Sequence, residues 1–435
     1  YDGTGQKLYN EAKKIIPGGT QLLSKRPEMF APGVWPAYYS KAKGSKIWDM
    51  DNREYTDMSI MAVGACILGY ADDDVDDAVI EAIKSGVNST LNCYEEVELA
   101  KLLLKLHPWF DSVRYTRSGG EAMSVAIRIA RAKTDKQVIL FSGYHGWSDW
   151  YLAANLSKDN ALDGQLMPGL EPRGVPRNLI GTSIPFDFNS LDSLKESIQA
   201  NKDDIAAIVI EPARGEEPNI DQLTKIKDIA SEIGAVLVFD EITSGFRMCP
   251  GGIHRKYGVH PDMAVFAKSM ANGYAMAAII GKEEVMESAQ TTFISSTNWT
   301  DRIGPTAAIA TIEKYISHNA ENHLISIGNK VKTIWREAAE ESEMDITVSG
   351  LPTLCNFTFN HEEARGLNTR FVSEMLKRGF LAFRQFKPSL AHDDQDINNY
   401  AKATKEIFIL LSSIPKDKIN DFQLAHDGFK RLTKE

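Results

Sequence analysis

The middle of the chain alternates short, uninterrupted apolar runs with segments that carry an apolar residue every three or four positions. Short apolar runs between polar and glycine-rich segments are typical of strands buried on both faces, and the wider spacing predicts amphipathic helices. The predicted strands are residues 138–141, 205–211, 235–240 and 261–268, and the predicted helices include residues 190–199 and 223–233. Strands that alternate with helices in this way predict βαβ units and a mostly parallel sheet.

The two ends of the chain carry different patterns. The N-terminal part predicts a short amphipathic helix that ends at Pro17, then a hairpin built from residues 37–40, 46–51 and 54–57. Residues 73–106 have helical spacing, with Val75, Val79, Ile80 and Ile83 on one face, and again Val97, Ala100, Leu103 and Leu104. The C-terminal part predicts a helix over about 309–318, with a continuation past Asn319 as the alternative, a strand over 353–359, and helices near 367–379 and 417–433.

The length of 435 residues exceeds one ordinary domain. We expect an N-terminal segment over residues 1–60, a large domain over 61–315 and a smaller C-terminal domain over 316–435. The net charge of −10 argues against nucleic acid or an anionic membrane as the main partner.

The four cysteines form no CxxC pair and no spacing typical of a metal site, so we expect no metal and a reducing compartment. The sequence contains no apolar run long enough to cross a bilayer, and no signal peptide precedes Tyr1. These features predict a soluble, cytoplasmic protein.

An acid and a lysine each end one of the central apolar runs. Asp240 ends the run 235–240, and Lys268 ends the run 261–268. Side chains at the carboxyl ends of parallel strands face the crevice in which open α/β sheets bind ligands. A pyridoxal phosphate enzyme needs this pair, because a lysine forms a Schiff base with the aldehyde and an acid keeps the pyridine nitrogen protonated. Alone, each residue also fits a solvated surface charge or a helix cap.

A third element lies upstream. Ser118 followed by Glu121 forms a capping box at the start of a strongly helical segment. This geometry leaves the amides of Gly119 and Gly120 free to meet a phosphate at the positive end of the helix dipole. A helix cap with no ligand is the alternative for this motif alone, but its order with Asp240 and Lys268 along one chain favours the cofactor.

Several motifs together resemble the class III aminotransferases and, within them, the glutamate-1-semialdehyde aminomutase branch. The motifs are Ile16-Pro-Gly-Gly19, Gly44-Ser-Lys-Ile-Trp-Asp-Met-Asp51, Ser118-Gly-Gly-Glu-Ala122, Gly143-Tyr-His-Gly146, Glu211-Pro212, Val238-Phe-Asp-Glu241, Gly245-Phe-Arg247 and Pro261-Asp262 before Lys268. The resemblance runs from about residue 8 to about residue 420. It implies fold type I, as in aspartate aminotransferase: an α/β large domain with a mostly parallel seven-stranded sheet and a smaller α+β domain.

The resemblance also implies roles for individual residues. Lys268 and Asp240 are the expected catalytic residues, Tyr144 would stack on one face of the cofactor ring and Ile242 would cover the other, although both also fit ordinary core packing. His145 is expected to be a structural hydrogen-bonder. The residues expected to bind pyridoxal phosphate are Ser118, Gly119, Gly120, Tyr144, His145, Glu211, Asp240, Ile242, Lys268 and Thr300.

Three positions leave alternatives open. The family usually has a threonine at the position of Gly120, so water or another donor must replace one hydroxyl. Thr300, with Thr297 as its rival, matches a threonine that reaches the phosphate in the partner subunit, and this implies a homodimer with shared active sites. Glu211 is either a cleft acid that contacts cofactor or substrate, or a structural acid at a strand end.

The substrate-binding positions depart from the aminomutase pattern. Lys25, with Arg26 beside it, stands where an arginine would bind the substrate carboxylate, and a lysine lacks the planar fork of that arginine. The runs 296–305 and 144–149 look like a sub-branch associated with amino-sugar and surface-polysaccharide pathways. The resemblance therefore implies an aminotransferase with a keto sugar or sugar acid as acceptor and glutamate as donor. A true aminomutase and a non-catalytic relative that binds pyridoxal phosphate or a nucleotide are the alternatives.

Overall fold

The structure is a computed structural model of the chain, and it describes residues 3–158, 160–165, 168–213 and 215–428. The chain divides into two compact units. Unit 1 consists of Tyr1–Asp72 and Asn322–Glu435, and unit 2 consists of Asp73–Glu321. Each unit has its own sheets and its own core, and the two are described separately.

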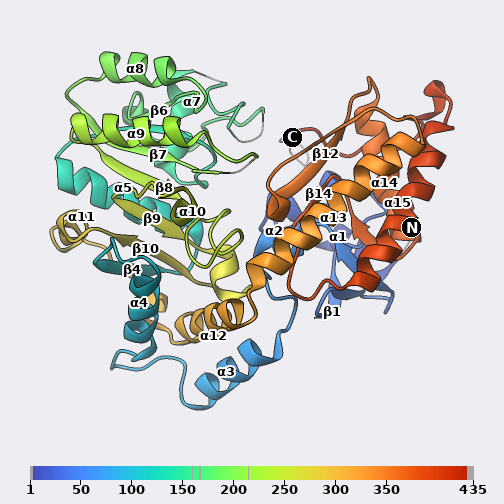
Figure 1. Ribbon diagram of the computed structural model, residues 1–435, viewed down its shortest axis with the longest axis horizontal. Coiled ribbons are helices and arrows are strands. Elements are labelled where there is room, and N and C mark those ends of the chain that lie inside the picture. The colour runs from blue at the N-terminus through green and yellow to red at the C-terminus, as the bar shows by residue number, and fades with distance from the viewer. Residues whose placement is uncertain (1–2, 159, 166–167, 214, 429–435) are drawn as a thin grey trace. The chain divides into compact units, whose positions relative to one another are not determined.

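A seven-stranded sheet forms the centre of unit 2, in the order β4-β10-β9-β8-β7-β5-β6 (Figure 1). Neighbouring strands from β6 to β9 are parallel, whereas β10 runs antiparallel to both β9 and β4. The strands are β4 (Ser112–Thr116), β5 (Val138–Ser142), β6 (Ser183–Pro185), β7 (Ile205–Ile210), β8 (Val236–Asp240), β9 (Met263–Phe266) and β10 (Ala277–Gly281). The mostly parallel, seven-stranded α/β sheet predicted for the large domain is confirmed.

The apolar runs form strands because both faces of this sheet are covered. Every residue of β5, β7, β8 and β9 is buried. Helix α5 packs across several strands of the sheet, and α9 packs against β8. The helices of unit 2 are α3 (Asp73–Lys84), α4 (Glu95–Leu106), α5 (Gly119–Thr134), α6 (Asp149–Leu152), α7 (Ala154–Ser157), α8 (Leu191–Ala200), α9 (Ile220–Glu232), α10 (His254–Tyr257), α11 (Glu283–Met286) and α12 (Ile303–Ser317). Short 3-10 helices are η3 (Arg177–Leu179), η4 (Lys268–Ala271), η5 (Glu287–Gln290) and η6 (Thr297–Thr300).

Unit 1 contains two small sheets. One has the order β1-β2-β3-β13 and the other has the order β11-β12-β14. The strands are β1 (Tyr39–Lys43), β2 (Lys46–Asp49), β3 (Glu54–Met58), β11 (Ile346–Ser349), β12 (Cys355–Phe359), β13 (Phe380–Ala382) and β14 (Gln385–Phe386). The predicted hairpin is present as β2 and β3, and β1 pairs with β2.

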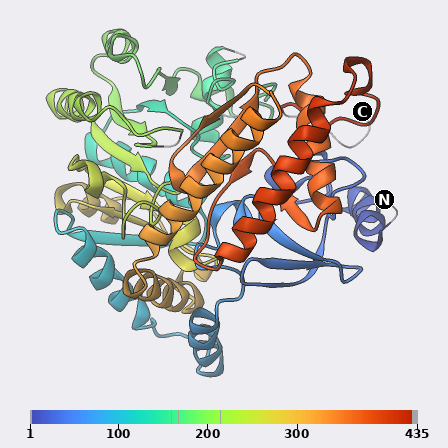
Figure 2. The same ribbon diagram turned by 45° about the vertical axis from the view of Figure 1, so that its right-hand side comes forward.

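Long helices complete unit 1, and α14 and α15 pack against each other (Figure 2). The helices are α1 (Thr4–Ile15), α2 (Met61–Gly64), α13 (Ala320–Glu341), α14 (Ala364–Lys377) and α15 (Asp394–Ser412), with 3-10 helices η1 (Leu23–Lys25), η2 (Pro27–Met29), η7 (Pro352–Leu354) and η8 (Lys416–Lys418). The core is aromatic, with Phe357, Phe371 and Phe408 buried together and Trp335 Nε1 donating a hydrogen bond to the Tyr400 hydroxyl at 2.8 Å.

Two predicted helical segments differ from the structure. Residues 73–106 form two helices, α3 and α4, separated by a loop. Ile80 and Ile83 do not face the core of the chain, because Val75, Val79 and Ala82 already form the buried stripe of α3. Over 419–428 the predicted helix is absent, and its residues 429–433 lie outside the described part of the chain.

Two further helices, α12 and α15, can be compared with the sequence pattern. The predicted helix over 309–318 is α12, and the left-handed backbone of Asn319, with φ of 47°, separates it from α13. Helix α15 was not predicted, although Ile397, Tyr400 and Thr404 repeat at helical spacing and are buried.

Two general expectations can be checked against the described residues. None of the helices in that part of the chain combines the length and the apolarity needed to cross a membrane. All four cysteines are free thiols, Cys66, Cys93, Cys249 and Cys355.

Candidate active site

The first turn of α5 forms a cradle at the carboxyl edge of the sheet. Ser118 is the N-cap, and its side chain accepts a hydrogen bond from the Glu121 amide at 3.4 Å. The Glu121 carboxylate in turn accepts from the amides of Ser118, at 2.9 Å, and Arg117, at 3.1 Å. The predicted capping box is therefore present. Gly119 and Gly120 are the first two residues of the helix, so their amides have no intrahelical acceptor and suit an anion.

Asp240 is the last residue of β8, is 3% exposed and is held by two donors. His145 Nδ1 lies 2.8 Å from Asp240 Oδ2, and the Ile242 amide donates to Oδ1 at 3.1 Å. The second ring nitrogen of His145 lies 3.2 Å from the Ser142 carbonyl oxygen. His145 is 1% exposed, so the ring is fixed between β5 and β8 and fixes the carboxylate in turn.

Lys268 follows the end of β9 and opens the short 3-10 helix η4. Its φ of 41° lies in the left-handed region, which is costly for a residue with a side chain. Strained backbone of this kind clusters at functional sites. The Lys268 amine donates a hydrogen bond to the hydroxyl of Thr243, Oγ1, at 2.8 Å.

The turn after β5 carries Tyr144 and approaches the end of β7. The Tyr144 amide donates to Glu211 Oε2 at 2.9 Å. Gly143 has a φ of 118°, and a side chain there would reach within 2.7 Å of the same carboxylate oxygen. Glu211 therefore shapes the turn that presents Tyr144. This contact supports the structural alternative for Glu211, while a contact with cofactor or substrate stays a prediction.

Ile242 and Gly119 meet at the edge of the cradle. A Cβ added to Gly119 would lie 2.8 Å from Ile242 Cδ1, so the isoleucine side chain rests directly on the first residue of α5. Both Tyr144 and Ile242 are partly buried and pack against the hydrophobic core of unit 2.

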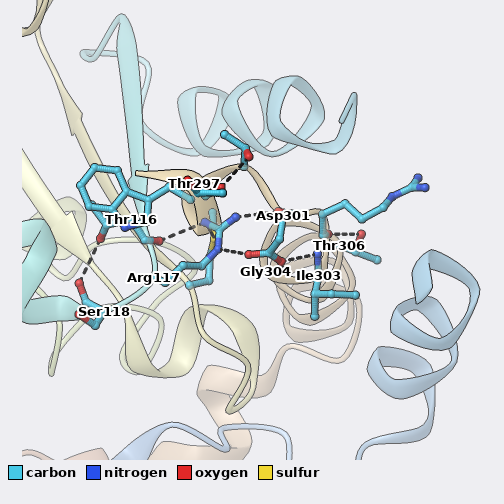
Figure 3. Close-up of polar contacts among 12 residues, drawn as sticks. Thr116, Arg117, Ser118, Thr297, Asp301, Ile303, Gly304 and Thr306 are labelled. Atoms are coloured by element: carbon cyan, nitrogen blue, oxygen red, sulfur yellow. Dashed lines mark hydrogen bonds and ion pairs between the residues drawn. The ribbon is translucent and has the colours of Figure 1, made fainter. Parts of the chain in front are cut away.

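The segment that contains Thr300 is joined to the start of α5 by contacts between Arg117 and Asp301 (Figure 3). Arg117 Nε lies 2.6 Å from Asp301 Oδ2, and Arg117 Nη2 donates to the Asp301 carbonyl at 2.7 Å. Asp301 Oδ1 also accepts from the Ile303 amide at 2.9 Å, at the start of α12. Thr300 itself is exposed, and its hydroxyl donates to the Thr297 carbonyl at 2.8 Å.

Two buried histidines, His254 and His107, make hydrogen-bond contacts with Glu241 and with the turn before α10. The Glu241 carboxylate accepts from the amide of His254, at 3.2 Å, and also contacts His254 Nδ1. His107 Nε2 accepts from the Gly252 amide at 2.9 Å, and Nδ1 lies 2.8 Å from the Leu103 carbonyl oxygen. Burial, with His254 nearby, lowers the pKa of His107 to about 3, so this ring is neutral and donates through Nδ1.

The structure brings most of the predicted site residues together in unit 2. Lys25 and Arg26 belong to unit 1, where the Arg26 guanidinium packs on Gly18, so their contact with substrate stays a prediction. Sequence reasoning missed Thr243 as the hydrogen-bond partner of Lys268. A threonine 25 residues from the lysine carries no motif, and only the turn after β8 brings the two together.

Comparisons with known proteins identify the family of this chain. The family pattern described as Aminotransferase class-III matches residues 29–407. The chain is 34% identical over 419 residues to the 3-aminobutyryl-CoA aminotransferase of Cloacimonas acidaminovorans (strain Evry), covering 92% of this chain and 95% of the relative. It is 31% identical over 429 residues to the glutamate-1-semialdehyde 2,1-aminomutase of Francisella tularensis subsp. tularensis (strain SCHU S4 / Schu 4), covering 93% and 98%.

Solved structures share the fold at lower identity. The FumI protein of Sphingopyxis sp. MTA144, solved with pyridoxal phosphate, superimposes with a TM-score of 0.84 at 24% identity, covering 94% of this chain and 97% of that one. An omega-transaminase from Sphaerobacter thermophilus gives 0.83 at 24% identity, covering 94% and 98%. The predicted family, fold type and cofactor are confirmed. The chain belongs to the class III aminotransferases, and it is an enzyme of fold type I that uses pyridoxal phosphate.

Proposed function

We propose that this chain is an aminotransferase that moves an amino group from a donor amino acid to a carbonyl-bearing acceptor, with Lys268 and Asp240 as catalytic residues. One observation carries the proposal: an acid ends one strand, and a lysine follows the end of the neighbouring parallel strand. Asp240 pairs with Val265 in the register of β8 and β9, and Lys268 follows three residues later. Open α/β sheets bind their ligands outside these strand ends.

The residues divide the chemistry between them. Pyridoxal phosphate, when bound, supplies an aldehyde that condenses with amines and a ring that accepts electrons. The Lys268 amine would hold the aldehyde carbon, and once a donor amine has displaced it, Nζ would be free to take the proton from the amine-bearing carbon of the donor and deliver it to the former aldehyde carbon. The Asp240 carboxylate would keep a proton on the ring nitrogen, and Tyr144 and Ile242 would cover the two ring faces.

Two acceptor classes fit the departures at the substrate positions. The positions expected to grip a substrate carboxylate lack the arginine that would bind it in a bidentate manner. A keto sugar, which the sub-branch resemblance favours, has no carboxylate for such an arginine to bind. A 3-oxoacyl thioester is the second candidate, favoured by the relative whose name specifies 3-aminobutyryl-CoA. We retain the keto sugar or sugar acid as the first proposal and glutamate as the donor.

We also propose a homodimer with shared active sites. Large apolar side chains are exposed on α3, on α4, on the loop between them and beside η6: Ile80, Ile83, Val87, Leu91, Tyr94, Val97 and Phe293. Exposed apolar side chains that gather into a patch mark an interaction site. Thr300 lies near Phe293 in the sequence, and in a two-fold dimer its hydroxyl would turn from the Thr297 carbonyl to the partner's phosphate. The free cysteines are consistent with the cytoplasm, the compartment we propose.

The experiment that tests the proposed reaction starts from the purified protein loaded with pyridoxal phosphate. Glutamate alone should bleach the visible absorbance of the lysine-bound cofactor and release one equivalent of 2-oxoglutarate. Adding a keto sugar should then restore the absorbance and produce the aminated sugar. An aminomutase would instead convert a single substrate with no keto acid released, and a non-catalytic relative would show no bleaching with any donor.

A further inference from the structure

The first turn of α5, the proposed phosphate cradle, has too few hydrogen-bond donors of its own for a phosphate. A phosphate presents three strong acceptor oxygens, and the first turn of α5 offers the amides of Gly119 and Gly120. The Ser118 hydroxyl already lies 3.0 Å from Glu121 Oε2, to which it donates. A further donor from elsewhere in the chain would complete the site.

The indole of Trp147 lies at this position. A Cβ added to Gly120 would come within 2.6 Å of Trp147 Nε1 and 3.0 Å of Cδ1. The nitrogen edge of the ring therefore fills the space that a side chain at position 120 would take. The indole nitrogen is a donor only. Trp147 Nε1 has no hydrogen-bond acceptor among the residues that the structure describes, and Trp147 is 69% exposed.

The residues on both sides of Trp147 are fixed against the same turn of α5. Gly146 has a φ of 101°, and a side chain there would lie 3.3 Å from Gly120 Cα. Ser148 Oγ lies 2.6 Å from Ser124 Oγ, and Ser124 donates to the Gly120 carbonyl at 3.0 Å. The indole is thus carried by a loop that is held in place, although the ring itself faces solvent.

We propose that Trp147 is a cofactor-binding residue whose indole N–H donates a hydrogen bond to the phosphate of pyridoxal phosphate. The inference rests on the proposed placement of that phosphate at Gly119 and Gly120. It explains why position 120 is a glycine in this chain, since a larger residue there would displace the donor. An exposed tryptophan could alternatively serve as apolar surface in the dimer, but that role needs the ring and not its nitrogen.

The first test separates the nitrogen from the ring. Trp147→Phe keeps an aromatic ring and removes the donor, and binding to the apoprotein is measured for pyridoxal phosphate, for pyridoxal and for inorganic phosphate. Because a hydrogen bond to a charged group is lost, affinity for pyridoxal phosphate and inorganic phosphate should fall about 10- to 100-fold. Affinity for pyridoxal, which has no phosphate, should change by less than about twofold.

Other outcomes overturn the inference in distinguishable ways. Unchanged binding of pyridoxal phosphate by Trp147→Phe removes any role for the nitrogen. Equal loss of pyridoxal and pyridoxal phosphate, with a change in sedimentation, assigns Trp147 to the dimer surface instead. If the wild-type apoprotein binds pyridoxal as tightly as pyridoxal phosphate, the placement of the phosphate itself is wrong.

A second test uses the close contact between Trp147 and position 120. Gly120→Thr should weaken binding of pyridoxal phosphate, because its side chain meets the indole, and Trp147→Ala should weaken it by removing the donor. The double variant has both the space and a new hydroxyl, so it should bind more tightly than either single variant. Additive losses in this double-mutant cycle would contradict the proposed exchange of one donor for another.

Discussion

Asp240 is held by His145 and by the Ile242 amide, and these two contacts fix the orientation of the carboxylate that we propose for the ring nitrogen. Preorganised charge of this kind is worth more than charge that must move into place during the reaction. His145 therefore makes hydrogen bonds to the protein through both ring nitrogens. The nitrogen of a cofactor ring can therefore meet an acid whose position the chain has fixed in advance.

Replacing Asp240 with Asn keeps the shape of the side chain and removes its charge. We expect the rate of the half-reaction with an amino donor to fall by two or more orders of magnitude, since stabilisation of developing charge is worth about 3–4 kcal/mol. Stopped-flow absorbance of the loaded protein measures this rate. A near wild-type rate would mean that a different group pairs with the ring nitrogen.

At the scale of single residues, the sequence was informative where chemistry coincides with a pattern. Asp240 and Lys268 could be placed at the ends of strands because each ends an apolar run. Thr243 and Trp147 were not, because a threonine partner for the lysine and an indole over Gly120 depend on how loops from different strands meet. The structure alone supplies such contacts.

At the scale of secondary-structure elements, strands and helices differ in how well the sequence predicts them. Buried strands were predicted well, because β5, β7, β8 and β9 are covered on both faces and read as continuous apolar runs. Helices were predicted less well where apolar residues lie outside the core. Ile80, at 46% exposed, and Ile83, at 53% exposed, gave α3 an apolar face that the single chain does not bury. The spacing of apolar residues in the sequence does not distinguish an exposed apolar face of a helix from a buried one.

The buried histidine His107 joins the end of α4 to the turn before α10, and it makes the stability of this region depend on pH. The pKa of His107 is about 3 in the folded chain because burial disfavours the charged ring, and the pKa of an exposed histidine is about 6.5. The unfolded chain therefore binds the proton first as the pH falls. The free energy of unfolding should decrease from about pH 6.5 towards pH 3, by at most about 1.4 kcal/mol per pH unit from this group.

His107→Gln keeps a polar side chain at this position and removes the titration. Urea unfolding of the apoprotein at several pH values measures the slope. The variant should be less stable than wild type near pH 7, because its contacts with Gly252 and Leu103 are altered, but its stability should fall less steeply below pH 6.5. Parallel pH profiles for the two proteins would show that His107 does not titrate as proposed.

For the whole molecule, the exposed apolar residues of α3, α4 and the loop between them predict self-association. Sedimentation at micromolar concentration should give a dimer. Leu91, which is 79% exposed, offers the disruptive change: Leu91→Asp should shift the protein towards monomer and lower its retention of pyridoxal phosphate. Thr300→Ala is the matched control, because it should weaken cofactor retention and leave the dimer intact. A wild-type monomer that retains cofactor and activity would contradict the shared site.

The central claim is that Lys268 is the residue through which this chain uses pyridoxal phosphate, and its substitution tests that claim most directly. Lys268→Ala should still bind the cofactor through the cradle and Asp240, but the absorbance of lysine-bound cofactor should be lost, and turnover with an amino donor and an acceptor should fall below a few per cent of wild type. A variant that kept the lysine-bound absorbance, or more than a few per cent of the wild-type kcat, would contradict the account.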